Sequence, residues 1–141
     1  MHRDQPRPDA LADGYGFSLY SRRLVNLLGA FNIAADVFPV QMVDEDHRPL
    51  AELEYSVFHL VEPIVDAMDD EKSGWVDFDA GLPRLVLKDG GFEERSILMC
   101  DRSWIQLMRD DLHQKIKQLG ITGFEFINPL DYRIGPYVSY K

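Results

Sequence analysis

The chain contains a single cysteine, Cys100, and this limits how it can fold. One thiol cannot close a disulfide within the chain or supply the thiolates of a cysteine-based zinc site, so the fold depends on its apolar core. Apolar residues make up 45% of the 141 residues and charged residues 28%, the composition of a globular chain able to bury one core. We expect one domain, residues 15–141, preceded by a flexible N-terminal tail, residues 1–14.

Negative charge is concentrated in the middle of the sequence. The chain has 24 acidic and 15 basic residues, a formal net charge of −9. Residues 44–79, the acidic segment, hold 12 of the acidic residues and two basic ones, a net charge of −10; the remaining 13 basic and 12 acidic residues give +1. Because such a segment repels phosphate backbones, direct binding of nucleic acid is disfavoured. Two interpretations stay open: a solvated face, or an interaction surface for a basic protein.

The first half of the chain is patterned as one helix and two strands. Apolar residues recur at helical spacing at Leu24, Leu27, Leu28 and Phe31. Ser18 or Ser21 is the expected N-cap of this helix. Residues 36–43 and 54–61 are rich in β-branched and aromatic side chains and are predicted strands. Pro39 cannot donate a ladder hydrogen bond, so the first of these is expected at a sheet edge or at a bulge.

The last third also alternates strand and helix. Residues 95–100 form a predicted strand, and Asp101 is a suitable N-cap for a following helix. That helix carries a spaced apolar stripe, at Ile105, Met108, Leu112, Ile116 and Leu119. Gly120 and Ile121 fit a Schellman C-cap. A strand over residues 124–127 would complete a right-handed parallel unit.

Between these parts, the sequence predicts a turn over residues 69–74 and short strands over residues 75–78 and 84–88. The predicted fold class is α+β, with a small mixed β-sheet packed against two main helices.

Catalytic patterns are missing from the sequence. It has no His-Glu-x-x-His, no Walker loop, no Gly-x-Ser-x-Gly and no Gly-x-Gly-x-x-Gly. Residues 69–80 partly match a calcium-binding loop, but Ala80 stands where the bidentate glutamate belongs. His59, within a predicted strand, and Cys100, at the end of another, have structural interpretations. We therefore expect no enzymatic activity, no cofactor and no metal site.

Three stretches resemble a known family. They are residues 37–40 (Val-Phe-Pro-Val), residues 65–73 (Val-Asp-Ala-Met-Asp-Asp-Glu-Lys-Ser) and residues 119–126 (Leu-Gly-Ile-Thr-Gly-Phe-Glu-Phe), the last being the most specific. In this order the chain resembles, over roughly residues 20–128, the immunity-protein family of bacterial polymorphic-toxin systems, formerly known as a bacterial domain of unknown function. The resemblance implies a non-catalytic protein that binds and neutralises a cognate toxin by direct occlusion.

An acidic immunity protein would be steered onto a basic toxin surface. The partner-binding residues proposed from the sequence lie in the second half of the acidic segment: Asp66, Asp69, Asp70, Glu71, Trp75, Asp77 and Asp79. Trp75 is the preferred aromatic anchor, and a core residue is its other interpretation. Weaker anchor candidates are tyrosines, namely Tyr55, Tyr132, Tyr137 and Tyr140.

Two other functions stay open. One is an adaptor or chaperone that stabilises a secreted effector. The other is a small enzymatic or ligand-binding domain with a pocket formed by Asp66, Asp70 and His59. The sequence has no visible signal peptide and no apolar run long enough to span a membrane, which favours a cytoplasmic location.

Overall fold

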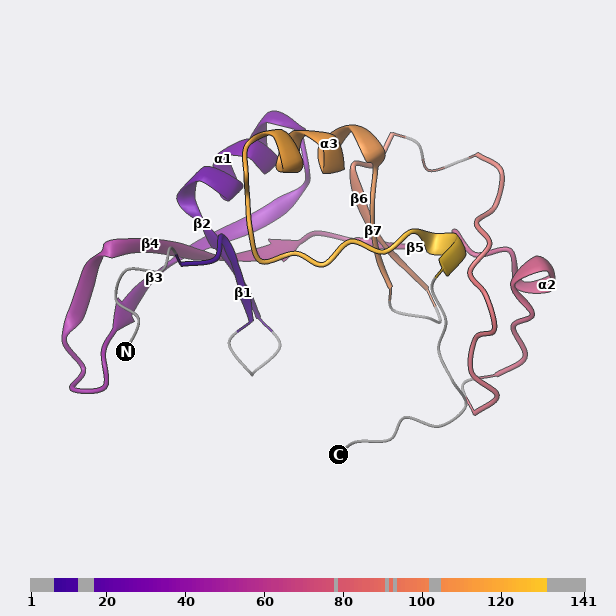
Figure 1. Cartoon of the computed structure of the whole chain (residues 1–141), viewed down its shortest axis with the longest axis horizontal. Helices are drawn as coiled ribbons and strands as arrows, with labels where there is room; N and C mark the ends of the chain where they lie inside the picture. Colours follow the sequence, from indigo (N-terminus) through magenta and orange to yellow (C-terminus); the bar gives the residue numbers. More distant parts are fainter. Residues whose placement is uncertain are drawn as a thin grey trace. The chain divides into compact units, whose positions relative to one another are not determined.

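The structure is a computed structural model that describes residues 7–12, 17–77, 79–90, 92, 94–101 and 105–131. The chain divides into two compact units (Figure 1). The first comprises Met1–Glu62 and Asp110–Phe124, and the second comprises Pro63–Arg109 and Glu125–Lys141. Helices and strands occur in both halves of the chain, so the predicted α+β class is confirmed, with the described strands in two sheets.

The first unit contains a four-stranded antiparallel sheet. Its strands are β1 (Ala10–Ala12), β2 (Ser18–Ser21), β3 (Ala35–Val43) and β4 (Pro49–Leu60), in the order β1-β2-β4-β3. The two longest strands, β3 and β4, form a hairpin. They contain the strand predicted over residues 36–43 and, except for Val61, the strand predicted over residues 54–61. The expectation for Pro39 is also confirmed, because β3 is the outer strand of this sheet and its ladder with β4 is irregular after Gln41.

Helix α1 (Arg22–Ala30) follows β2 directly and packs against β2 and β4 (Figure 1). Ser21 is its N-cap, and the Ser21 Oγ accepts a hydrogen bond of 3.3 Å from the Leu24 backbone N–H. The predicted apolar stripe is buried through Leu24, Leu27 and Leu28. On the sheet, the Tyr20 ring stacks on Phe58 with 5.2 Å between centroids. The helical stripe was predicted correctly, and of the two predicted N-caps, Ser18 and Ser21, the structure has Ser21.

Helix α3 (Asp110–Gln118) ends as the sequence predicts. Gly120 adopts a left-handed backbone with φ of 63°. Its N–H donates to the carbonyl of Lys117, and the N–H of Ile121 donates to the carbonyl of Ile116, each at 3.1 Å. These two bonds are the Schellman pair, and the side chains of Ile116 and Ile121 are buried.

The start of that helix was predicted wrongly. Instead of a helix from Asp101, residues Gln106–Met108 form strand β7, which pairs antiparallel with β6 (Ile97–Cys100). The Cys100 N–H donates to the carbonyl of Ile105 at 2.7 Å, so this backbone is engaged in a ladder. Strand pairing with an apolar neighbour overrides a helical spacing of apolar residues.

The second unit is built around a three-stranded mixed sheet. Strand β5 (Ile64–Val65) runs parallel to β6, and β7 completes the order β5-β6-β7. The core beside it contains six buried residues, Ala67, Met68, Leu82, Leu85, Leu98 and Cys100. Cys100 is fully buried with a free thiol, in agreement with its structural interpretation. The unit also contains a short helix, α2 (Asp70–Ser73), and a 3-10 turn, η1 (Pro129–Asp131).

Several local predictions differ from the structure. Part of the segment predicted as a flexible tail, residues 1–14, is ordered structure, because Ala10–Ala12 form β1 and Asp9 is buried. Residues 1–6 and 13–14 of that segment lie outside the described residues. The turn over residues 69–74 contains α2. Residues 75–77 and 124–127 are not strands, so the parallel unit is not formed, and Phe78 lies outside the described residues. Over residues 84–88, pairing is limited to an isolated bridge from Leu87 to Met68.

Among the described residues, no helix has the length and apolar character needed to cross a membrane.

Candidate functional site

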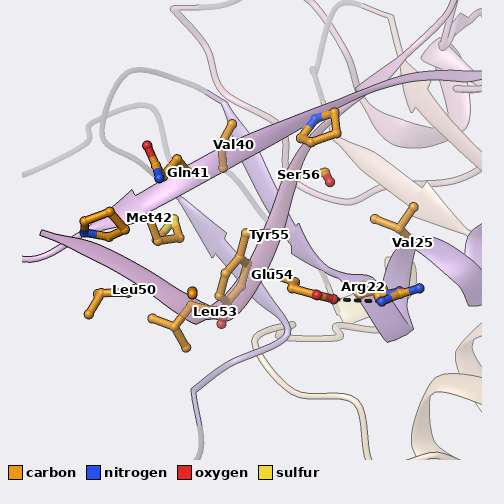
Figure 2. A pocket seen from close by; sticks show the side chains of 13 residues that line it. Arg22, Val25, Val40, Gln41, Met42, Leu50, Leu53, Glu54, Tyr55 and Ser56 are labelled. Atoms are coloured by element: carbon orange, nitrogen blue, oxygen red, sulfur yellow. Dashed lines mark hydrogen bonds and ion pairs between the residues drawn. The ribbon is translucent and has the colours of Figure 1, made fainter.

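A groove lies in the first unit between the start of α1 and the β3–β4 hairpin (Figure 2). We call it the hairpin groove. Its volume is about 610 Å³, within the range of small-molecule ligand pockets. It is lined by residues of α1, β3 and β4: Arg22, Val25, Pro39, Val40, Gln41, Met42, Pro49, Leu50, Ala51, Leu53, Glu54, Tyr55 and Ser56.

An irregularity in strand pairing produces this groove. Gln41 pairs with Glu54, and the next pair along the ladder is Val43 with Pro49. Met42 of β3 therefore faces four residues of β4, residues 50–53, which is a large β-bulge. In the described ladder, none of these four residues has a register partner on β3. Leu50, Ala51 and Leu53 of the bulge line the groove directly.

The lining combines apolar side chains with one ion pair. Five apolar residues are half-buried, Val25, Val40, Met42, Leu50 and Leu53. The Nη1 atom of Arg22 lies 3.1 Å from Glu54 Oε2, and Figure 2 shows the two side chains facing each other at one end of the groove. Their side chains are 72% and 58% exposed. An ion pair this exposed contributes little stability and exchanges readily.

Tyr55 forms a fixed part of the groove wall. Its ring is buried, and its hydroxyl donates a hydrogen bond of 2.6 Å to the Pro8 carbonyl. Burial raises the pKa of the Tyr55 hydroxyl, and the negative charge of Asp9 adds to that rise. Tyr55 therefore stays a neutral donor and is anchored within its own unit, which argues against its use as a free aromatic anchor.

The hairpin that carries the groove is strongly acidic. Residues 35–60 contain six acidic residues and one basic residue, Arg48. At the tip, the carboxylate of Asp44 accepts hydrogen bonds of 2.9 Å from the N–H groups of Asp46 and Arg48. Asp44 therefore shapes the turn, while the side chains of Glu45 and Asp46 are exposed to solvent.

The partner-binding residues predicted from the sequence all lie in the second unit. Four of them lie in the short helix α2 or precede it. Asp66 is exposed and forms an ion pair of 2.8 Å with the Lys88 Nζ. Asp69 is the N-cap of α2, and its Oδ1 accepts from the Lys72 N–H at 3.0 Å. Asp70 is half-buried in the first turn, and Glu71 is exposed.

The other three predicted residues follow α2 in the chain. Trp75 is half-buried and packs against the core of the second unit, as its core interpretation requires. Asp77 is exposed, and its Oδ1 accepts from the Ala80 N–H at 2.8 Å. Asp79 is exposed. The side chains of Asp66, Asp69 and Asp77 thus have structural contacts, and Glu71 and Asp79 are the other two exposed acids of the seven.

Sequence reasoning missed the role of Ser73. This residue is fully buried at the end of α2, its hydroxyl donates to the Val86 carbonyl at 3.0 Å, and it accepts from the Val86 N–H at 2.8 Å. The next residue, Gly74, ends the helix with φ of 71°. The Asp-Glu-Lys-Ser stretch therefore has a structural explanation, in which Asp69 begins the turn and Ser73 binds a distant backbone segment.

The acidic segment is thus divided between the two units. Its first part, residues 44–62, belongs to the first unit with the hairpin groove, and residues 63–79 belong to the second. The pocket suggested from Asp66, Asp70 and His59 is divided in the same way, because His59 lies exposed on β4 of the first unit. The groove itself was missed because the sequence does not encode a bulge in any recognisable motif.

The second unit has a smaller hollow of about 210 Å³. It is lined mostly by apolar residues and by two arginines: Leu87, Phe92, Arg95, Leu98, Leu107, Met108, Arg109 and Pro129. Within the part of the chain that the structure describes, no group of three His, Cys, Asp or Glu side chains is placed to hold a metal ion.

Comparison of the chain with family models, with curated proteins and with solved structures gives no match.

Proposed function

We propose that the chain is a cytoplasmic immunity protein that binds a cognate bacterial toxin and neutralises it by occlusion, with the hairpin groove as its main contact surface. The observation that carries this proposal is the combination of a half-buried apolar lining with exposed acidic residues on one hairpin. The resemblance of residues 37–40, 65–73 and 119–126 to immunity proteins points to the same function.

In this proposal, the acidic side chains affect the rate of association and the apolar lining affects the rate of dissociation. The acidic side chains accelerate the encounter with a basic toxin surface, such as the substrate cleft of an enzyme that binds phosphate. The apolar lining, including Met42, Leu50 and Leu53, supplies contacts that become buried in the complex and slow its dissociation. The exposed acids of the second unit, Glu71 and Asp79, add to the long-range attraction.

The proposal is tested by co-expression with a candidate toxin, beginning with any encoded in a neighbouring gene. Growth should be rescued, and the two proteins should purify as a complex with a dissociation constant well below micromolar. Failure to rescue growth, together with no complex at micromolar concentrations, would overturn the proposal.

The same experiment separates the proposal from an adaptor or chaperone. An adaptor raises the amount of folded effector and leaves the effector's toxicity intact, whereas an immunity protein abolishes toxicity at unchanged effector levels. Immunoblotting of the effector beside the growth assay distinguishes the two. A small-molecule enzyme or ligand-binding domain would give neither result.

A further inference from the structure

We propose that the hairpin groove binds a peptide segment in which a basic residue lies next to an apolar one, and that the basic residue replaces Arg22 as the partner of Glu54. The inference rests on the proposed function, because it gives the chemistry of the toxin segment that the groove would receive. Three structural features support the inference: the Arg22–Glu54 ion pair, the bulge at residues 50–53 and the apolar lining of the groove.

The ion pair is suited to exchange. Arg22 and Glu54 meet at 3.1 Å, but both side chains are more than half exposed, so water competes for each charge. A guanidinium or ammonium group delivered by a partner would meet Glu54 with part of that water excluded, and exclusion of water strengthens an ion pair between fixed groups. The released Arg22 remains solvated on the surface of α1. Arg22 thus occupies the place of the incoming cation in the free protein.

The apolar lining provides the second half of the recognition. Met42, Leu50 and Leu53 are half-buried, so each keeps apolar surface that a partner can cover. In Figure 2 the labelled Leu50 and Leu53 of β4 and Met42 of β3 lie along the hairpin, away from the Arg22–Glu54 pair. A basic residue at Glu54 and an apolar residue beside it would therefore occupy different parts of one groove.

Backbone groups of the bulge favour an extended segment as the occupant. In the described ladders, residues 50–53 of β4 have register partners on neither β3 nor β2. Extended peptides add to strand backbone that is open at a sheet edge through main-chain hydrogen bonds, while alternate side chains enter pockets. The six acidic residues of the hairpin, against Arg48 alone, select a basic segment and repel an acidic peptide or a nucleic acid.

A defined probe tests this directly. The probe is a nine-residue peptide that alternates arginine with leucine, and its control has glutamate in place of every arginine. Titration into the ¹⁵N-labelled full chain should shift the amide signals of Arg22, residues 50–53 and Glu54 with the basic peptide and not with the acidic one. Shifts confined to other residues, or equal shifts with both peptides, would overturn the inference.

Charge variants test the exchange at Glu54. Arg22→Ala should tighten peptide binding about twofold to fivefold, because it removes the internal competitor. Arg48→Ala removes the same charge from the hairpin tip, outside the groove lining, and should change affinity less. Glu54→Gln should weaken binding by a similar factor, and Glu52→Gln, on a residue that does not line the groove, is its matched control. If the two variants of each pair changed the affinity equally, the peptide affinity would depend only on net charge. That result would overturn the proposed replacement of Arg22 at Glu54.

Apolar variants test the rest of the groove. Leu53→Ala should weaken binding at least threefold, whereas Val43→Ala, on the same hairpin but outside the lining, should leave it unchanged. Thermal unfolding of both variants shows whether the hairpin is retained, and Leu50→Ala provides a second groove variant if Leu53→Ala unfolds.

The two proposals can fail separately. A toxin complex whose affinity is insensitive to Glu54 and Leu53 variants would leave the immunity function standing and remove the groove as its site. Selective binding of the basic peptide without any toxin complex would leave the groove chemistry standing and remove the immunity function.

Discussion

Arg23 and Asp9 form a two-bond fork in which the Nε and Nη2 atoms of Arg23 each lie 2.7 Å from a carboxylate oxygen of Asp9. The same guanidinium also donates to the carbonyls of Leu119 and Gly120, at 3.1 and 2.9 Å, just beyond α3. One side chain of α1 thus joins the N-terminal segment to the end of a helix almost one hundred residues later. Thr122 adds an N–H bond of 3.0 Å to the Asp9 carboxylate.

Substitution of Asp9 should destabilise the first unit. Asp9→Asn keeps the shape of the side chain but removes the charge that accepts from Arg23, Ser21 and Thr122, and we expect a loss of about 2 kcal/mol in unfolding free energy. Urea denaturation measures this loss. Asp46→Asn is the matched control, since Asp46 is exposed at the hairpin tip, and a similar loss there would contradict the assigned role of Asp9.

The same carboxylate predicts a pH dependence. The hydrogen bonds from Arg23, helped by those from Ser21 and Thr122, hold the pKa of Asp9 well below its ordinary value of 3.8. A depressed pKa in the folded state gives stability that is present above the unfolded value and is lost as the pH falls below it. The stability difference between wild type and Asp9→Asn should therefore be constant from pH 7 to 5 and shrink below pH 4. A difference that stays constant down to pH 2 would contradict this.

Two glycines should respond oppositely to the same substitution. Gly123 has φ of 100°, and a Cβ there would overlap the carbonyl oxygen of Ala10, so Gly123→Ala should cost at least about 2 kcal/mol. Gly29 lies in α1 with open space around its Cα, so Gly29→Ala should stabilise the chain by about 0.5–1 kcal/mol. Thermal unfolding compares them, and a shift of the same sign in both would be unexpected.

Ser73 should be required for the second unit. Ser73→Ala removes the hydroxyl partner of the half-buried Val86 N–H, at an expected cost of about 1–3 kcal/mol. The Val86 carbonyl loses the same hydroxyl but still accepts from the Asp69 N–H. Glu71→Ala changes an exposed residue of the same helix and should alter stability by less than about 0.5 kcal/mol. Hydrogen exchange at Val86, which should accelerate in the serine variant alone, provides a local readout.

The kinetics of the proposed toxin complex should separate electrostatic steering from direct contact. The double variant Glu71→Lys with Asp79→Lys reverses exposed charges and avoids Asp69, whose substitution would uncap α2. We expect the association rate constant to fall about threefold to tenfold at low salt, with a weaker salt dependence, while the dissociation rate constant stays unchanged. Stopped-flow mixing measures both rates. An unchanged association rate would identify these acids as a solvated face.

The sequence predicted correctly those elements whose ends or faces are marked by neighbouring residues, such as caps, apolar stripes and prolines. The leucine stripe of α1 and the Gly120–Ile121 ending depend on residues close in sequence, and both were predicted correctly. The N-cap of α1 was narrowed to Ser18 or Ser21, and Ser21 is the one observed. Pro39 likewise marked an edge strand from the chemistry of one residue. These features need no knowledge of what packs against them.

Long-range pairing explains what the sequence did not reveal. Residues 105–108 have helical spacing, but pairing with β6 makes three of them a strand, and this depends on the apolar partner strand. In the sequence, Asp9 belongs to a polar N-terminal segment, and its role depends on hydrogen bonds from Arg23 and from the distant Thr122. The groove depends on a mismatch of register between β3 and β4, which follows from the lengths of both strands and their turn together.

The bulge at residues 50–53 also sets where the sequence can vary in length. The ladder from Ala35 to Gln41 pairs with residues 54–60, and those pairs do not depend on how many residues stand opposite Met42. An insertion or deletion within the bulge would therefore reshape the groove and leave the paired base of the hairpin in register. Related chains that must each recognise a different partner would have, at this one position, a way to diverge in specificity without refolding the sheet.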